Sequence, residues 1–506
     1  MSNKLTILGI SASLRNARRG LGNVDLINQL NSLDSKETLN AFLEQEAFSH
    51  LENFKVAGRT EKLPFDQMYT NLKKQKGNKG LSNSEVALAS ALWSAKELGV
   101  EIDHLSLSEY YTESGVKNEE ELVQKLLEAD GIILSSPVYF GDRSSLAQTF
   151  IELIRSNDKV KHSLKGKIFA GIAVGAKRNG GQETTLIYQL MDMLNVGLLG
   201  VGNDSETTSQ YGGTGLAGDV GTMAKDSYGL DTSMGTGRRI ARVVQMMNLG
   251  KDYQLQGKVR VQFWILQDKD GKAVSFINKL IEPHLEKIEP IIINVFENKI
   301  VRCIACDICP THVDVDEEYR CIIKSKKDDF KDIHPNFLNS DAIIPVVYCP
   351  EDKNGLKSNY QNFIERTRYL RRGDYVMSDI ITAPIVVEEV GVREHMDIRM
   401  ITSLIRHHTI VSKPIISYVQ NEELLNKTKI ENDFEGLIET IKEVAKGRLI
   451  IYSKESDHLK YKPVGYVLST VKDLEDEKLK KRNEMMLSRQ ENVSKMKADK
   501  LIRNAK

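Results

Sequence analysis

Cysteine, long apolar runs and an excess of charge of one sign are all scarce in this 506-residue chain. Five cysteines are too few for a disulfide scaffold in a chain of this length. No apolar run reaches the length of a membrane span, and the polar start MSNKLTILGISAS lacks the layout of a secretory signal. These absences predict a cytoplasmic protein without a membrane partner.

The charged residues are balanced, because 70 lysines and arginines stand against 70 aspartates and glutamates. A net charge of zero provides no global field that would favour nucleic acid or an acidic membrane, so we expect no nucleic-acid partner. Partners must therefore be recognised locally. The length also exceeds one ordinary core and indicates roughly two to four domains.

The strongest local pattern is ADGIILSSPVYFGDRSSLAQTF at residues 129–150, which reads as an apolar strand, a turn and the start of a helix. Ligands of open parallel sheets lie outside the carboxyl ends of the strands, so chemistry is expected at this turn. Pro137 restricts the backbone, Tyr139 and Phe140 can lie against a flat ring, and Gly141 permits close approach. The turn suits a planar ligand; the alternative is an ordinary turn with core aromatics.

A loop suited to phosphate follows the first apolar strand, residues 5–10. The sequence GISASLRNARRG supplies hydroxyls and a guanidinium at Ser11, Ser13 and Arg15. Such a loop usually opens directly into a helix whose N–H groups complete the phosphate site. Here the best-capped helix, VALASALWSAKELG, comes much later.

We infer that an insertion over about residues 17–81 splits the phosphate loop. Its second half would supply Ser82, Asn83 and Ser84. The alternative is that residues 23–30 form the true first helix and that Ser82 merely caps another one.

Alternating strand and helix signals continue after residue 150 and predict a doubly wound parallel sheet. A glycine-rich loop between a buried strand and a helix offers backbone N–H groups at Gly175, Asn179, Gly180 and Gly181. A second glycine-rich stretch, from residue 210 to a helix that begins at about Tyr228, is expected to form a surface loop facing a substrate or a nicotinamide; the alternative is an inert surface loop.

Four motifs in order, GISASLR, SSPVYFGD, GAKRNGGQET and GGTGLAGDVGT followed by GRRIA, resemble the NADPH-dependent FMN reductase family of the flavodoxin-like superfamily. The resemblance implies FMN, NADPH or NADH as electron donor, and a homo-oligomer. It assigns the phosphate to the first loop and the isoalloxazine ring to the SSPVYFG and GAKRNGG loops. The ring residues so implied are Pro137, Val138, Tyr139, Phe140 and Gly141. The split first loop departs from the family pattern.

The same alternation of strand and helix signals recurs over residues 259–419, where PVVYCPED corresponds to SSPVYFGD. We interpret this as an internal duplication. The phosphate loop of the second copy carries Asp268 and Asp270, whose carboxylates would repel a phosphate dianion. This copy is therefore expected to be structural or dimerising rather than a second flavin site.

Four cysteines lie close together, at Cys303, Cys306, Cys309 and Cys321, and resemble the cysteine loop of iron–sulfur flavoproteins and their cluster-free relatives. Thiolates at two-residue spacings can converge on one metal centre. Eleven residues separate the last two, however, which is longer than the compact spacing of cluster-bearing relatives. An iron–sulfur cluster, a zinc site and reduced thiols all remain open. Cys349 is expected to be a buried apolar filler.

The expected fold class is α/β, with two flavodoxin-like doubly wound parallel sheets in tandem and a small C-terminal α+β or helical region. The expected boundaries are 1–255 for the FMN-binding domain, 256–420 for the second domain, and 421–506 for an extension that ends in a charged helix. That extension is a candidate site for a protein partner. The basic run ERTRYLRRGDY suits an anionic substrate, an acidic partner or a solvated helix face.

The expected function is FMN-dependent NAD(P)H oxidation coupled to a small electron acceptor such as a quinone, a nitro compound, a flavin or a biosynthetic intermediate. The alternatives are an iron–sulfur flavoprotein that carries electrons to a protein partner and a non-catalytic assembly protein. No side chain is assigned as a catalytic acid or base.

Overall fold

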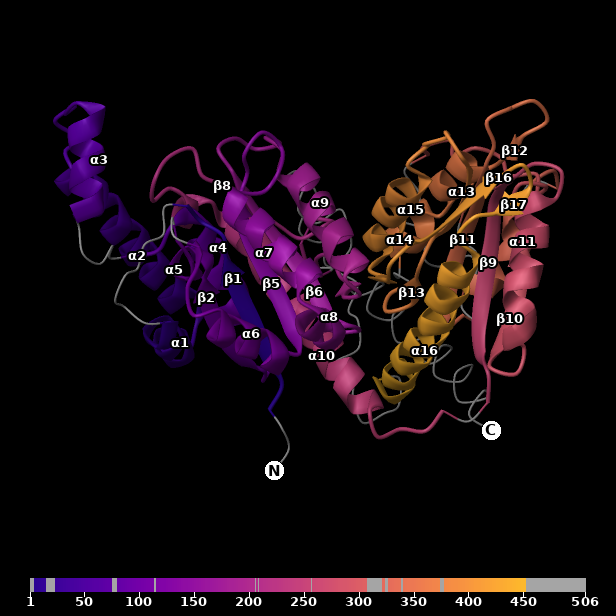
Figure 1. The fold of residues 1–506 in the computed structure, drawn as a ribbon, viewed down its shortest axis with the longest axis horizontal. Helices are drawn as coiled ribbons and strands as arrows, with labels where there is room; N and C mark the ends of the chain where they lie inside the picture. The colour runs from indigo at the N-terminus through magenta and orange to yellow at the C-terminus, as the bar shows by residue number, and fades with distance from the viewer. Residues whose placement is uncertain are drawn as a thin grey trace. The chain divides into compact units, whose positions relative to one another are not determined.

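The computed structural model describes residues 4–14, 23–74, 80–112, 115–204, 206–207, 209–255, 257–306, 321–323, 326–337, 340–373 and 377–451. Contacts divide the chain into two compact units, residues 1–245 and 246–506. Each unit contains its own parallel sheet with helices packed on it (Figure 1).

The first unit has a parallel sheet in the order β2-β1-β5-β6, with β7 and β8 both paired to the outer side of β6. In chain order this is 2-1-3-4-5, the flavodoxin-like arrangement. The predicted α/β class is thereby confirmed. The strands are β1 (Thr6–Ser11), β2 (Glu101–Ser106), β5 (Gly131–Pro137), β6 (Ile168–Gly175), β7 (Leu199–Gly200) and β8 (Gly213–Leu216), and β3 (Tyr111–Thr112) forms a separate hairpin with β4 (Gly115–Val116).

Helices cover both faces of this sheet. A Cβ atom on Gly9 would meet α4, and one on Gly131 would meet α10. The strand register puts these two glycines on the same face, whereas Gly171 points to the other face and packs against α9. The helices are α4 (Asn83–Lys96), α5 (Leu107–Tyr110), α6 (Glu119–Glu128), α7 (Ser145–Ser156), α8 (Asp158–Leu164), α9 (Gln182–Asn195) and α10 (Ser227–Gly250).

Three helices precede α4: α1 (Asn23–Ser32), α2 (Lys36–Val56) and α3 (Phe65–Lys74). The helix that packs on β1, β5 and β6 is α4, whereas α1 packs on β2 and on α4 itself. Ser82 caps α4 in a capping box with Glu85. The helix after Ser82 therefore occupies the position of the first crossover helix.

The second unit repeats the strand order. Its parallel sheet runs β10-β9-β11-β14-β16, again 2-1-3-4-5, with short strands β13 and β15 alongside and antiparallel β12 and β17. The strands are β9 (Val259–Asp268), β10 (Ile288–Ile293), β11 (Ala342–Cys349), β12 (Lys357–Ser358), β13 (Ile381–Thr382), β14 (Ile385–Glu389), β15 (Ile410–Val411), β16 (Ile415–Gln420) and β17 (Glu423–Leu424). The helices are α11 (Lys272–Ile281), α12 (Phe330–Phe337), α13 (Tyr360–Arg366), α14 (Arg368–Gly373), α15 (Met396–Leu404) and α16 (Lys427–Ile451).

Alternate residues of β9 face two different layers of the core. Trp264 stacks edge-on against Phe337 and Phe363 on one side. Phe263 contacts Phe434 of α16 on the other side. Helix α16, which the sequence places in a C-terminal extension, thus contributes to the core of the second unit.

The stretch GRLII, residues 447–451, ends α16 and is helical although it contains two isoleucines. The helical spacing of buried residues continues through Ile441, Ala445 and Leu449, so the apolar face of the helix reaches the end of the stretch. Arg448 is also buried there, and its Nη1 donates to the carbonyl oxygen of Ser340 at 3.1 Å. Packing overrides the strand preference of the two isoleucines.

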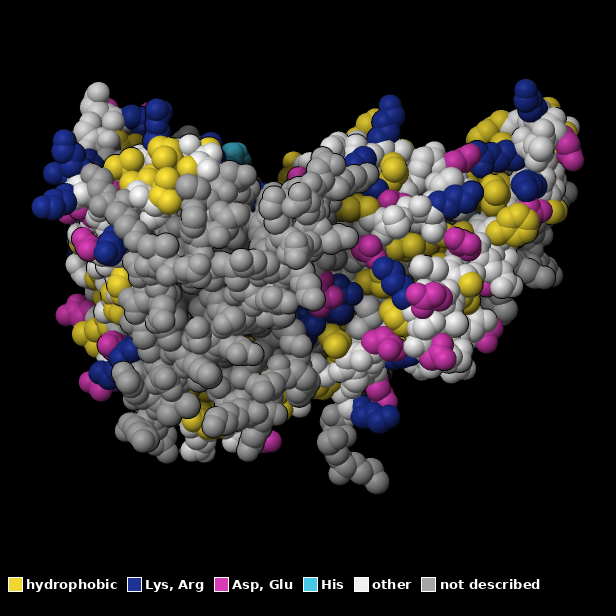
Figure 2. All heavy atoms as spheres, turned by 180° about the vertical axis from the view of Figure 1, so that it is seen from behind, with side chains coloured by type: hydrophobic (Ala, Val, Ile, Leu, Met, Phe, Trp, Pro, Cys, Tyr) yellow, Lys and Arg dark blue, Asp and Glu magenta, His cyan; other side chains and the backbone are white. Residues whose placement is uncertain are grey.

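Basic and acidic side chains of the described residues lie interspersed on the face drawn in Figure 2. This is the distribution expected from equal numbers of the two charges. None of the helices in the described ranges combines the length and the apolar character that crossing a bilayer requires.

A buried ion pair holds together the two ends of the cysteine loop, which form its neck. Arg366 donates to both carboxylate oxygens of Asp328 at 2.8 Å, and neither side chain is exposed. The same carboxylate accepts from the backbone N–H of Val301 at 2.9 Å. Asp329 pairs in a similar way with the backbone of Lys299. The residues before and after the loop are therefore held together.

Replacing Arg366 by Met should destabilise the second unit by about 3–5 kcal/mol, because it leaves a buried carboxylate unpaired. Urea unfolding followed by tryptophan fluorescence measures this in a Trp93→Phe background, where Trp264 reports on the second unit. The double variant with Asp328→Leu should recover part of the loss. Arg260→Met, which removes the exposed pair with Glu289, should cost no more than about 1 kcal/mol. Equal effects of the two single variants would contradict the assignment.

Candidate functional site

Three loops of the first unit meet at the carboxyl edge of its sheet. Ala12, after β1, donates its N–H to the carbonyl oxygen of Ser135 at 2.8 Å. Its own carbonyl oxygen accepts from the hydroxyl of Ser144 at 2.6 Å. The loop after β8 joins through Ala217, whose N–H donates to the carbonyl oxygen of Gly175. The loops predicted to converge are thus brought together.

The turn after β5 presents an aromatic side chain to solvent. Tyr139 and Asp142 exchange two backbone hydrogen bonds, of 2.7 and 3.0 Å. Between them, Phe140 and Gly141 have φ angles of 54° and 81°, as in a type I′ turn. A left-handed conformation costs a residue such as Phe about 1–2 kcal/mol, and such strain concentrates at functional sites. Phe140 is nevertheless fully exposed at the tip of the turn.

Two glycine backbones bring the next loop against this turn. A Cβ atom on Gly181 would lie 2.7 Å from the Cα of Gly141, so the two loops touch without side chains between them. Gly181 and Asn179 both have positive φ angles. Gln182 closes the loop by accepting from the N–H of Gly180 at 2.7 Å. The backbones of the two loops are therefore in contact at Gly141, the residue after the exposed Phe140.

The loop after β1 carries an unusual hydroxyl. Ser11 is buried, and its Oγ has no hydrogen-bond partner among the described residues. Buried polar groups are rarely left unpaired, and a ligand oxygen at this edge would supply the missing partner. Ser13 is nearly buried beside it. Arg15, also predicted here, lies outside the described residues.

The second half of the predicted phosphate loop reaches the same edge, since the hydroxyl of Ser135 donates to the carbonyl oxygen of Ser84 at 2.8 Å. The side chain of Ser82 is engaged in capping α4. The amide of Asn83 donates to the carbonyl oxygen of Asp219 at 2.9 Å and accepts from the N–H of Met223. These two side chains therefore serve internal contacts.

The second glycine-rich stretch is only partly a surface loop. Gly213–Leu216 forms β8 and pairs with β6, so the expectation of a surface loop is wrong there. The small residues fit because a Cβ on Gly213 or Gly215 would strike neighbouring atoms within 3.0 Å. The rest of the stretch is tied to the inserted helices by an ion pair of 2.6 Å between Arg59 and Asp219. The sequence gives no signal for that long-range pair.

The corresponding edge of the second unit is acidic. Asp268, at the end of β9, is buried, and its Oδ1 accepts from the N–H groups of Lys269 and Ala273 at 2.7 and 2.8 Å. Burial raises the pKa of Asp268 above its usual value. A cavity of about 660 Å³ beside it is also lined by Asp270 and Glu297. The carboxylate of Asp268 thus occupies the amide donors that a phosphate would need at the start of α11.

The described cysteines do not by themselves form a metal site. Cys303 and Cys306 are half-buried, and Cys321 is buried in the apolar core. Within the described ranges, no three His, Cys, Asp or Glu side chains are arranged to hold a metal ion. Cys309 lies outside the described residues. We therefore derive no chemistry from a cluster here.

Residues 77–205 match the NADPH-dependent FMN reductase family. An iron–sulfur flavoprotein of Methanocaldococcus jannaschii is 34% identical over 179 residues, which cover 33% of this chain and 92% of that protein. An NAD(P)H dehydrogenase (quinone) of Caulobacter vibrioides is 32% identical over 130 residues, covering 24% of this chain and 65% of that protein. A WrbA-like flavodoxin structure from Agrobacterium tumefaciens aligns with 48% of this chain and 97% of that chain, at 14% identity and a TM-score of 0.26.

The strand order and the loops at the carboxyl edge define a flavodoxin-like oxidoreductase of the FMN reductase type. The chain belongs to the iron–sulfur flavoprotein family. The predicted enzyme class, an NAD(P)H-dependent FMN reductase-type oxidoreductase, is confirmed. FMN and NAD(P)H, predicted from the motifs, are the cofactors of this class.

Cys349 should resist alkylation in the folded chain. It is fully buried, as expected from the sequence, and burial raises the pKa of its thiol to about 12, so the thiol stays protonated at pH 8. Peptide mass spectrometry after iodoacetamide treatment at pH 8 should find the half-buried Cys303 and Cys306 modified and Cys349 unmodified. In urea, Cys349 should react. Rapid labelling of Cys349 in the native chain would show that its environment is more open than described.

Proposed function

We propose that the chain is an FMN-dependent NAD(P)H oxidoreductase whose first unit holds the flavin. The electron acceptor is a small molecule such as a quinone, a nitro compound, a flavin or a biosynthetic intermediate. When bound, FMN supplies hydride acceptance from the nicotinamide and onward electron transfer. The observation that carries the proposal is the exposed Phe140 in a left-handed turn, held against the Gly181 backbone at the carboxyl edge of the sheet.

The phosphate end of the flavin is assigned to the loop after β1 and the start of α4. Ser11 and Ser13 offer hydroxyls, and the first turn of α4 offers the backbone N–H groups of Asn83 and Ser84. A helix N-terminus favours an anion because its N–H groups and its dipole both point at the ligand. The insertion before α4 is compatible with this role, because it leaves α4 packed on β1.

The ring end is assigned to the turn after β5 and the glycine-rich loop after β6. Tyr139 and Phe140 supply exposed aromatic faces. The backbone N–H of Val138 is already bonded to the carbonyl oxygen of Val174, so Val138 contributes its side chain. The permissive glycines of the second loop let backbone groups approach the ring closely.

The second unit is proposed to be a copy without a flavin. The identical strand order supports a duplication. The carboxylate of Asp268, bound to the amides of the next helix, supports the loss of the phosphate site. A structural or dimerising role for this unit remains the proposal, and a homo-oligomer is expected with it.

Phe140→Ala should weaken FMN binding by about 1–2 kcal/mol, roughly a five- to thirtyfold rise in Kd, because the ring loses one aromatic face. Quenching of flavin fluorescence on titration measures the Kd, and NADPH oxidation with a quinone acceptor measures activity. Tyr188→Ala is the matched control, since Tyr188 is an exposed aromatic on α9 at 43% exposure. Unchanged FMN affinity in Phe140→Ala would contradict the assignment of the ring site. A chain that takes up no FMN would contradict the proposed FMN-dependent function.

A second candidate function is electron transfer to a protein partner by an iron–sulfur flavoprotein. Membership of that family favours it, together with the closed neck that holds the ends of the cysteine loop at Asp328. The candidate residues remain Cys303, Cys306, Cys309 and Cys321.

Iron and sulfide analysis of anaerobically purified protein tests this second function. A cluster predicts stoichiometric iron and sulfide in the unaltered chain and their loss in Cys303→Ser, with FMN content unchanged. Cys349→Ala should keep its iron, because Cys349 ends β11 and is not part of the cysteine loop. Iron at background level in the unaltered chain would exclude the cluster.

A further inference from the structure

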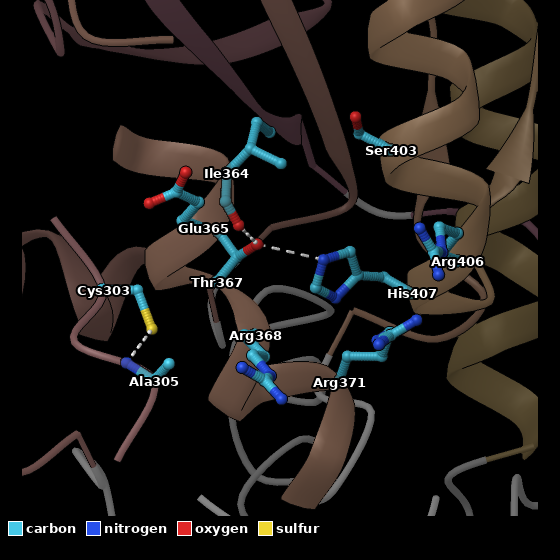
Figure 3. A pocket seen from close by; sticks show the side chains of 10 residues that line it. All are labelled: Cys303, Ala305, Ile364, Glu365, Thr367, Arg368, Arg371, Ser403, Arg406 and His407. Carbon is cyan, nitrogen blue, oxygen red and sulfur yellow. Dashed lines mark hydrogen bonds between the residues drawn. The ribbon is translucent and has the colours of Figure 1, made fainter. Parts of the chain in front are cut away.

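We propose that the second unit binds a phosphate group carrying an O–H donor, in a pocket where Arg368, Arg371 and Arg406 face His407. The pocket has a volume of about 400 Å³ and is also lined by Cys303 and Thr367. Figure 3 shows the three guanidinium groups and the imidazole around it. The inference concerns residues that the proposed flavin function does not use.

The pocket lies away from the edge that corresponds to the flavin loops. It is formed where α13 leads into α14 and where α15 ends. Helices that connect parallel strands start at the carboxyl edge of the sheet and return toward the amino edge. The pocket is therefore at the opposite edge from Asp268, which closes the would-be phosphate site of this unit.

The basic run ERTRYLRRG divides into two kinds of arginine. Arg366 is buried and paired with Asp328, as described above. Arg368 and Arg406 form no ion pair with any residue in the described part of the chain, and the buried Nε of Arg406 has no hydrogen-bond partner there. The acidic residue Glu365 lines the pocket and accepts from Gln361 at 3.5 Å. Guanidinium groups without carboxylate partners fit a phosphate, whose oxygens match their planar donors.

His407 gives the pocket a hydrogen-bond acceptor among these donors. Its Nε2 lies 3.1 Å from the hydroxyl of Thr367, which itself donates to the carbonyl oxygen of Ile364 at 2.7 Å. Because the hydrogen of this hydroxyl is donated to Ile364, Nε2 must donate to the hydroxyl oxygen of Thr367. Nδ1 then has a free lone pair, and it is buried without a partner in the described part of the chain.

The environment keeps this imidazole neutral. Burial, together with Arg371 and Arg406, lowers the pKa of His407 to about 3. Nδ1 therefore accepts and does not donate at neutral pH. A ligand that satisfies both the arginines and Nδ1 must combine negative oxygens with an O–H group. Hydrogen phosphate has both, and so does a phosphate ester with a free hydroxyl, whereas sulfate at neutral pH has no proton to donate.

The size of the pocket distinguishes the two sources of phosphate. A volume of about 400 Å³ falls in the range of small-molecule sites, which is about 300–1,000 Å³, and leaves room beside the phosphate. Ile364 and Ala305 add apolar lining. The pocket thus favours a hydroxylated phosphate ester over free phosphate.

Isothermal titration of the FMN-loaded full chain tests the proposal, since bound FMN fills the phosphate site of the first unit. The probes are inorganic phosphate, sulfate and glycerol phosphate at constant ionic strength. Phosphate should bind about tenfold or more tightly than sulfate, because sulfate leaves Nδ1 unpaired. Glycerol phosphate binding more tightly than phosphate would identify the ester as the source, and the reverse order would identify free phosphate.

Variants locate the site. Arg368→Gln and Arg406→Gln should each weaken phosphate binding about tenfold or more, because each removes a charged donor. Arg393→Gln, an exposed arginine of the same unit, should leave it unchanged. His407→Met should abolish the preference for phosphate over sulfate. Should that buried variant not fold, the same preference measured in the unaltered chain tests the role of His407.

Three results would overturn the proposal. Absence of phosphate binding to the unaltered chain would remove the site. Undiminished binding in both arginine variants would remove it from this pocket. Equal affinity for phosphate and sulfate would remove the assignment of His407 as an acceptor.

Discussion

The N–H groups at the start of the first crossover helix determine what each unit can hold. In the first unit these groups belong to α4, whose first turn lies at the same edge as Ser11, a buried hydroxyl with no partner among the described residues. In the second unit the corresponding donors, at the start of α11, are bonded to Asp268 of the same chain. A carboxylate and a phosphate compete for the same positive end of a helix. One sheet order is thus compatible with the proposed ligand site in one unit and with a closed edge in the other.

The insertion before α4 must also leave the start of this helix at the carboxyl edge of the sheet. Residues 12–82 separate β1 from α4, yet α4 still packs on β1, β5 and β6. The inserted segment contacts the loop after β8 through the ion pair of Arg59 with Asp219, and Asn83 of α4 donates to the same loop. A long insertion in a loop costs little conformational free energy when the flanking elements are held by the sheet. The loop after β8 is therefore held in part by the insertion.

Much of the fold can be predicted from the sequence because buried parallel strands are continuous apolar runs, and β1, β5, β6, β9 and β11 all have that signature. The turn after β5 could also be predicted, because Pro137 and Gly141 mark it locally. Capping by Ser82 was one of the alternatives read from the sequence, whereas the role of Asn83 could not be predicted, because its partners Asp219 and Met223 lie far away in the chain. The strand at Gly213–Leu216 was missed because glycine normally disfavours strands, and only close packing against β6 explains it.

The different roles of the arginines in the run ERTRYLRRG of the second unit could not be predicted from the sequence. Arg366 and Arg368 are two residues apart, and nothing in the run distinguishes them. Tertiary structure separates them, because Asp328 reaches the first while the second turns to the pocket of His407. The acceptor character of His407 depends on a still longer chain of contacts, through Thr367 to the carbonyl oxygen of Ile364. The unit whose Asp268 bonds the start of α11 thus places Arg368 and Arg406, which form no ion pair within the described residues, at its other edge, where the family resemblance assigns no ligand.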